Sequence, residues 1–109
     1  MSPLPLTVPV REIGRLCRRH HIRRLALFGS VLREDFRADS DVDVLVEFEP
    51  GHKIGLRFWD IEDELTAVLG RKVDLNTPED LSIYFRSQVL AEARPLYDQQ
   101  IHDQQTAQR

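Results

Sequence analysis

The stretch 41–49, DVDVLVEFE, constrains the fold most strongly because apolar and acidic residues alternate along it. Residues two apart share one face of a strand. One face would carry Val42, Val44, Val46 and Phe48. The other begins with Asp41 and Asp43, although aspartate is among the residues that strands tolerate least. The stretch therefore predicts a half-buried strand with paired carboxylates on its outer face. A purely solvated face is the alternative, because Glu47 and Glu49 continue the acidic pattern.

Hydrophobic periodicity predicts how the rest of the chain is organised. The expected elements are helix 9–20, strand 23–29, a short helix from 31, strand 41–49, helix 55–70, strand 72–76 and helix 77–93. Residues 95–97 are expected to form either a short edge strand or a packing segment. Pro9 suits a first helical position, Ser30 an N-cap and Gly70 a C-cap. The buried face of the first helix is expected to be Val10, Ile13, Leu16 and Cys17. That of the last helix is expected to be Leu81, Phe85, Val89 and Leu90.

The lengths of the connections predict the topology of the sheet. The segment before 72–76 contains a helix and is long enough to cross over to a parallel strand, whereas 31–40 is short enough to return antiparallel. A small mixed sheet flanked by helices follows, which is an α/β (α+β) fold. Residues 9–97 are expected to form one domain, between an extended arm over 1–8 and a polar, disordered tail over 98–109.

Composition is that of an ordinary globular protein. A chain of 109 residues can bury one modest core. No stretch reaches the ~20 apolar residues of a membrane span, so no membrane is expected. The single cysteine, Cys17, fits a reducing cytoplasm. The net charge of −3 argues weakly against a protein that coats nucleic acid, and no sequence-specific nucleic-acid binding is expected.

A third carboxylate, Asp74, lies on the polar face of the strand 72–76. If this strand neighbours 41–49, Asp41, Asp43 and Asp74 converge, and mutual repulsion would raise the pKa of at least one of them. A divalent cation would remove that conflict. Hard oxygen ligands favour magnesium, which often completes its shell with phosphate oxygens. Zinc is not expected, because the four histidines (His20, His21, His52 and His102) show no ligand spacing.

Gly29 and Ser30 stand where a buried strand meets the start of a short helix. Glycine lets a phosphate approach the backbone, and the first N–H groups of a helix attract anions. Ser30 could donate its hydroxyl to a phosphate, or act as a plain N-cap. Arg33, expected in the first turn of the same helix, could reach a triphosphate or be an ordinary surface residue. The P-loop pattern GxxxxGK[ST] is absent, which excludes that route to nucleotide binding.

At these residues the chain resembles the DNA polymerase beta-like nucleotidyltransferases, and in particular the minimal nucleotidyltransferases (MNT) that are antitoxins in HEPN/MNT toxin–antitoxin modules. The match is Gly29-Ser30, ten residues, Asp41-Val42-Asp43, and then Asp74 in RKVDLNT. It extends from the first helix to about Tyr97. One departure is Glu34, because many relatives have glycine after the arginine. A carboxylate there would weaken triphosphate binding unless it points to solvent.

The resemblance implies an enzyme that uses ATP and two magnesium ions. It assigns Asp41, Asp43 and Asp74 as catalytic residues and metal ligands. It assigns Gly29, Ser30, Arg33 and Ser40 to nucleotide binding. The implied reaction is transfer of AMP to a tyrosine of a partner HEPN ribonuclease, which silences that toxin.

Two other functions stay open at this point. A binding module of the same fold could neutralise a ribonuclease by occupying its surface. Nucleotidylation of a small molecule uses the same chemistry, but the chain leaves little room for a separate substrate pocket. The basic stretch 18–24, RRHHIRR, can be read as cations at the negative end of a helix dipole, or as a site for an acidic partner or RNA.

Overall fold

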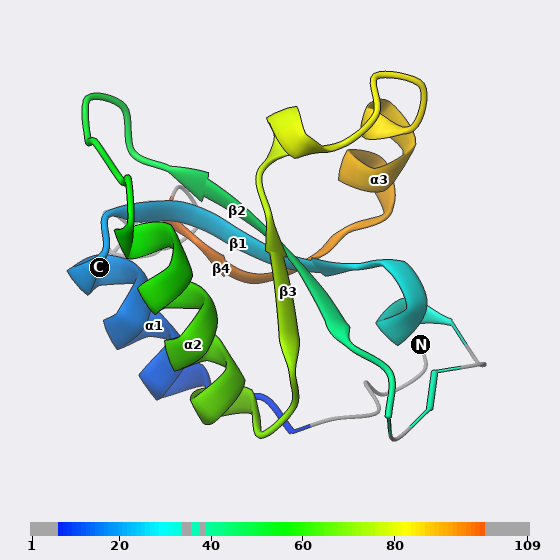
Figure 1. The fold of residues 1–109 in the computed structure, drawn as a ribbon, viewed down its shortest axis with the longest axis horizontal. Helices are drawn as coiled ribbons and strands as arrows, with labels where there is room; N and C mark the ends of the chain where they lie inside the picture. Colours follow the sequence, from blue (N-terminus) through cyan, green and yellow to red (C-terminus); the bar gives the residue numbers. More distant parts are fainter. Residues whose placement is uncertain (1–6, 34–35, 38, 100–109) are drawn as a thin grey trace, which may run out of the picture.

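A four-stranded sheet with helices packed against it forms the fold (Figure 1), as seen in a computed structural model that describes residues 7–33, 36–37 and 39–99. The elements are α1 (Val10–Arg19), β1 (Ile22–Phe28), the 3₁₀ helix η1 (Gly29–Leu32), β2 (Val42–Phe48), α2 (Arg57–Leu69), β3 (Val73–Asn76), the 3₁₀ helix η2 (Pro78–Asp80), α3 (Arg86–Glu92) and β4 (Arg94–Asp98). The predicted α/β class is confirmed. Glu34 and the tail from residue 100 onward lie outside the described residues.

The sheet is mixed, as the connection lengths predict. Its strand order is β3-β2-β1-β4, so β1 occupies a central position. β1 pairs antiparallel with both β2 and β4, whereas β2 and β3 are parallel and joined through α2. Of the two alternatives expected for 95–97, the edge strand is the one observed, as part of β4. No helix among the described residues is both long enough and apolar enough to cross a bilayer.

The core lies between one face of the sheet and the pair α1 and α2, which lie side by side in Figure 1. β2 and β3 contribute the alternating residues Val42, Val44, Val46, Val73 and Leu75. Ile13, Leu16 and Cys17 of α1 are buried as predicted, but Val10 is 67% exposed, because it stands at the first residue of the helix. Pro9 is the N-cap of that helix rather than its first residue.

The long final helix predicted over 77–93 is wrong. The start signals are genuine, since Thr77 and Asp80 form a capping box, but the 3₁₀ helix that they begin ends at Asp80. The chain turns before α3 begins at Arg86. None of the four residues expected to be buried there is fully buried, and Phe85 is 61% exposed. In Figure 1, α3 lies apart from α1 and α2, so neither of these two helices packs against it.

Side chains of α2 hold the edge strand β3 in place. The hydroxyl of Thr66 accepts a hydrogen bond from the Val73 N–H at 3.1 Å, and Glu62 Oε2 accepts one from the Leu75 N–H at 2.9 Å. Both donors point away from β2 and would otherwise lack a partner in the sheet. The two bonds flank Asp74 in the sequence, so they fix the backbone position from which its carboxylate projects.

The Thr66 hydroxyl is expected to stabilise the protein through this bond. Thr66→Val keeps the shape of the side chain but leaves the Val73 N–H unpaired, which should lower the free energy of unfolding by about 1–3 kcal/mol. Thr66→Ser retains the hydroxyl and serves as the control. Urea denaturation measures both variants. A loss of stability in Thr66→Ser with none in Thr66→Val would show that packing of the methyl group, and not the hydrogen bond, is what matters.

Candidate active site

The three predicted aspartates meet at one end of the parallel pair β2 and β3. Asp43 stands directly beside Asp74 in the register of the two strands. Their neighbours Val42 and Val73 also pair and are buried, which turns both aspartates to the opposite face. Asp41 lies two residues before Asp43, on the same side. The predicted adjacency of these strands is therefore confirmed.

Asp43 is the least exposed of the three carboxylates. Burial raises its pKa above the ordinary value of 3.8, and the charges of Asp74 and Asp41 raise it further. A hydrogen bond from the Ser30 backbone N–H acts in the opposite direction. The expectation that crowding raises the pKa of one of these carboxyl groups is confirmed at Asp43.

Gly29 is required where β1 turns into η1. Its φ is +75°, a conformation that side chains disfavour, and a Cβ at this position would collide with Asp43 Oδ2. The prediction that Ser30 caps a helix is wrong, because Ser30 lies within η1, whose N-cap is Phe28. The Gly29-Ser30 turn instead lets the Asp43 carboxylate approach the backbone and accept a hydrogen bond from the Ser30 N–H.

Arg33 and Ser40 both follow this turn in the chain. Arg33 is exposed and follows the last residue of η1, rather than standing in a first helical turn as predicted. Together with Gly29 it borders a cavity of about 600 Å³ that is otherwise mainly apolar, with Leu32, Phe85 and Val89 among its walls. The Ser40 hydroxyl accepts a hydrogen bond from the Arg37 N–H at 3.1 Å, so it shapes the loop that leads to Asp41.

Arg71 is a contributor to the site that the sequence did not reveal. Its guanidinium donates to the Arg37 carbonyl at 2.7 Å and stacks over the Phe36 ring at 4.7 Å from the centroid. Arg71 comes shortly before β3, and residues 36 and 37 come shortly before β2. These contacts therefore tie together the segments that lead into the two acidic strands. A single arginine in a turn carries no signal that could have predicted this.

The basic stretch 18–24 is largely neutralised within the chain. Arg19 and His20 contact Glu64 of α2 at 2.6 and 3.0 Å. Arg23 and Arg24 contact Glu47 of β2 at 2.6 and 3.4 Å. These ion pairs with neighbouring elements account for most of the cluster.

The donor set at the acidic end of the sheet fits magnesium. All three side chains offer carboxylate oxygens, the ligands that this ion prefers, and they project from adjacent strands. Burial and the charges of Asp74 and Asp41 together raise the pKa of Asp43, and a bound dication would favour its ionised form. Fold and site together define a small mixed sheet that carries a carboxylate cluster suited to holding a divalent cation, beside a glycine turn.

Comparison with known proteins identifies the family. The nucleotidyltransferase domain model matches residues 11–97. The protein adenylyltransferase MntA of Thermococcus cleftensis is 39% identical over 74 residues, which are 68% of this chain and 74% of that protein. The chain belongs to the nucleotidyltransferase family, in its minimal (MNT) branch, as the resemblance predicts.

Solved structures share the fold. One described as a minimal nucleotidyltransferase is 40% identical, with a TM-score of 0.66, and the match covers 79% of this chain and 87% of that one. A toxin–antitoxin complex with AMP-PNP contains a chain 23% identical, with a TM-score of 0.65 and coverages of 89% and 79%. A tri-AMPylated Shewanella oneidensis HEPN toxin in complex with its MNT antitoxin gives 24% identity, a TM-score of 0.57, and coverages of 87% and 74%.

Ionisation of Asp43 is expected to destabilise the metal-free fold. Because its pKa is raised, the folded protein holds this proton more tightly than the unfolded chain does. The free energy of unfolding should therefore fall as pH rises from the ordinary value through the raised one. Above this pH range, Asp43→Asn should have a larger free energy of unfolding than wild type. Below the range, this difference should disappear. Urea denaturation with EDTA over a pH series tests this, with the exposed Asp63→Asn as the control. A constant difference at every pH would contradict it.

Gly29→Ala should lower the free energy of unfolding by more than backbone strain alone would. Gly70 has a similar φ of +70°, but a Cβ there would meet no atom within 4 Å. Gly70→Ala thus isolates the conformational strain, about 1–2 kcal/mol, and Gly29→Ala adds the collision with Asp43. Denaturation curves give both losses. Adding Asp43→Ala to Gly29→Ala should restore part of the lost stability. If the double mutant is no more stable than Gly29→Ala, a collision with Asp43 does not explain the additional loss.

Proposed function

We propose that this protein is the antitoxin of a toxin–antitoxin pair and a magnesium-dependent protein adenylyltransferase, which transfers AMP from ATP to a tyrosine of a HEPN ribonuclease partner. The observation that carries the proposal is the convergence of Asp41, Asp43 and Asp74 beside the Gly29-Ser30 turn. The names of the relatives support it, since one is a protein adenylyltransferase and others come from toxin–antitoxin complexes with AMP-PNP or an AMPylated HEPN toxin. Because ATP and magnesium are supplied in the cytoplasm, the pair would act there.

The proposed reaction is an in-line displacement at the α-phosphorus of ATP. The tyrosine oxygen forms a bond to that phosphorus, the bond to the bridging oxygen of the β-phosphate breaks, and pyrophosphate leaves. Asp74 would orient the tyrosine hydroxyl and accept its proton, because it is exposed at the edge of the acidic cluster. Asp41 and Asp43 would hold both magnesium ions, and Asp74 would complete the metal site. Bound magnesium would supply neutralisation of the phosphate charge.

The remaining residues would position the nucleotide. Gly29 and Ser30 would offer backbone and hydroxyl donors to the triphosphate, and the exposed Arg33 would pair with its outer oxygens. Ser40 would assist from the loop before Asp41. Catalysis by such a site consists mainly of positioning and charge neutralisation rather than covalent chemistry by the protein.

A second candidate function is neutralisation of the toxin by binding alone. Three consecutive large apolar side chains are exposed before α3: Ile83 is 71%, Tyr84 87% and Phe85 61% accessible. An apolar strip of this kind is typical of a surface that a partner covers. The strip and the acidic site are compatible in one protein, so the two functions must be separated by experiment.

AMP transfer should depend on the paired aspartates. The purified protein, incubated with its cognate toxin, ATP and magnesium, should add AMP to a toxin tyrosine, as read by intact mass and peptide mass spectrometry. Asp41→Asn with Asp43→Asn should reduce transfer by at least about 10³-fold, the order of loss when a charge-stabilising group is removed. Asp63→Asn should leave it unchanged.

The same double variant separates the two functions. If it still binds the toxin but no longer protects cells from it, the modification is required for neutralisation. Full protection by the inactive variant would establish neutralisation by binding alone. Absence of any adduct with the folded wild-type protein would refute the transferase proposal.

A further inference from the structure

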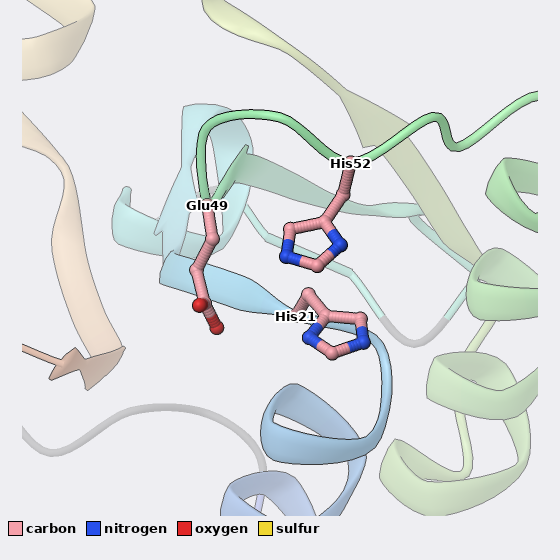
Figure 2. A group of neighbouring side chains, drawn as sticks. All are labelled: His21, Glu49 and His52. Atoms are coloured by element: carbon pink, nitrogen blue, oxygen red, sulfur yellow. The ribbon is translucent and has the colours of Figure 1, made fainter.

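A second group of ligand-type side chains lies at the opposite end of the sheet from the aspartates. His21, Glu49 and His52 each offer one ligand atom, and these atoms all lie within 4.8 Å of one another. Figure 2 shows the two imidazole rings stacked, with the Glu49 carboxylate beside them. His21 precedes β1 and Glu49 follows β2, whereas Asp43 pairs with Phe28 at the far end of the same antiparallel pair. The two groups are therefore separated by the length of β1, roughly 20 Å.

Local backbone geometry brings the three residues together. Pro50 and Gly51, with φ +87°, form a turn that places Glu49 and His52 at its two ends. The Glu49 N–H donates to the His21 carbonyl at 2.8 Å, which ties this turn to the start of β1. His21 itself has φ +57°, an uncommon conformation for a residue other than glycine. The cluster is thus built from two segments joined by a backbone hydrogen bond.

The ligand atoms are not used by other side chains. Within 7–33, 36–37 and 39–99, no hydrogen bond or ion pair engages the side chains of His21, Glu49 or His52. The adjacent histidine differs, because the His20 ring contacts Glu64 at 3.0 Å. Within the cluster itself the histidine rings are stacked, with centroids 3.9 Å apart and planes at 8°. Two imidazoles and a carboxylate remain available to an ion.

We propose that His21, Glu49 and His52 form a binding site for a divalent transition metal of the zinc class, separate from the magnesium site proposed at the aspartates. Two imidazole nitrogens and one carboxylate oxygen are a ligand set that zinc uses with a fourth position left open. Magnesium prefers all-oxygen coordination and does not suit this set. The histidines show no ligand spacing in the sequence because the approach of His21 to His52 is tertiary and leaves no local motif.

Modest side-chain movement would complete the site. Ligand atoms on one zinc lie roughly 3.3 Å apart, given bonds of ~2.0–2.1 Å and tetrahedral angles, so the rings must rotate out of their stack and close on the ion. His52 is exposed and has room for this rotation. Cys17 does not compete, because it is buried and burial raises the pKa of its thiol to about 12. A bound ion would clamp the 49–52 turn onto the start of β1.

Zinc titration of the full, tag-free chain tests the proposal. Calorimetry with excess magnesium present should detect one zinc per chain, and cobalt should give the visible absorption bands of a low-symmetry nitrogen–oxygen site. His52→Ala and Glu49→Gln should each weaken zinc binding at least about tenfold, since even residues that only support a ligand can cost that much. His21→Asn should do the same while keeping the left-handed backbone, which asparagine tolerates.

Control variants separate this site from adventitious binding and from the aspartates. His102→Ala removes a histidine that is not one of the three proposed ligands, and Asp41→Asn with Asp43→Asn removes the acidic pair; both variants should retain zinc binding. Circular dichroism checks that every variant is folded. Zinc affinity unchanged by His52→Ala and His21→Asn, loss of binding in the aspartate variant, or no binding in the presence of magnesium would each overturn the proposal.

Discussion

The parallel pairing of β2 with β3 is the constraint on which the site depends. In-register pairing places Val42 beside Val73 and Asp43 beside Asp74. The valines are buried under the helices, so burial of apolar surface on one face holds the carboxylates together on the other. A slip of one residue would turn the aspartates into the core, where isolated charges are very costly. The stability of the core and the crowding of the carboxylates are thus two results of one register.

Helix α2 contributes twice to this arrangement. As the crossover between the parallel strands, it makes their pairing possible. Through Thr66 and Glu62 it also accepts hydrogen bonds from the β3 N–H groups that point away from β2. Arg71 then links the turn after α2 to the loop before β2. At the other strand junction, the absent side chain of Gly29 leaves space that the Asp43 carboxylate fills. Asp74 is therefore positioned by contacts of its sequence neighbours, whereas Asp43 also accepts a hydrogen bond from the Ser30 N–H.

The two ends of the β1–β2 pair differ in their chemistry. One end gathers oxygen ligands around Asp43, and the other gathers imidazole nitrogens and the Glu49 carboxylate. Between them, Glu47 and the arginines of β1 neutralise one another. This separation means that ions of different preference would have different sites on the same sheet. The exposed strip of Ile83, Tyr84 and Phe85 supplies none of these ligands, although Phe85 lines the cavity that Gly29 and Arg33 border.

Much of this protein was determined by the sequence alone. Alternation in 41–49, broken only at Leu45, predicted a half-buried strand, and connection lengths predicted a mixed sheet. The pattern of Asp41, Asp43 and Asp74 indicated a shared carboxylate site, because these signals are local or depend only on chain length. Tertiary structure alone decided the rest. The segment after Thr77 has helical periodicity, but periodicity states which residues would share a face and not whether a core exists to bury that face. The support from Arg71 and Thr66 and the meeting of His21 with His52 depend on contacts between distant segments, which only the folded chain brings together.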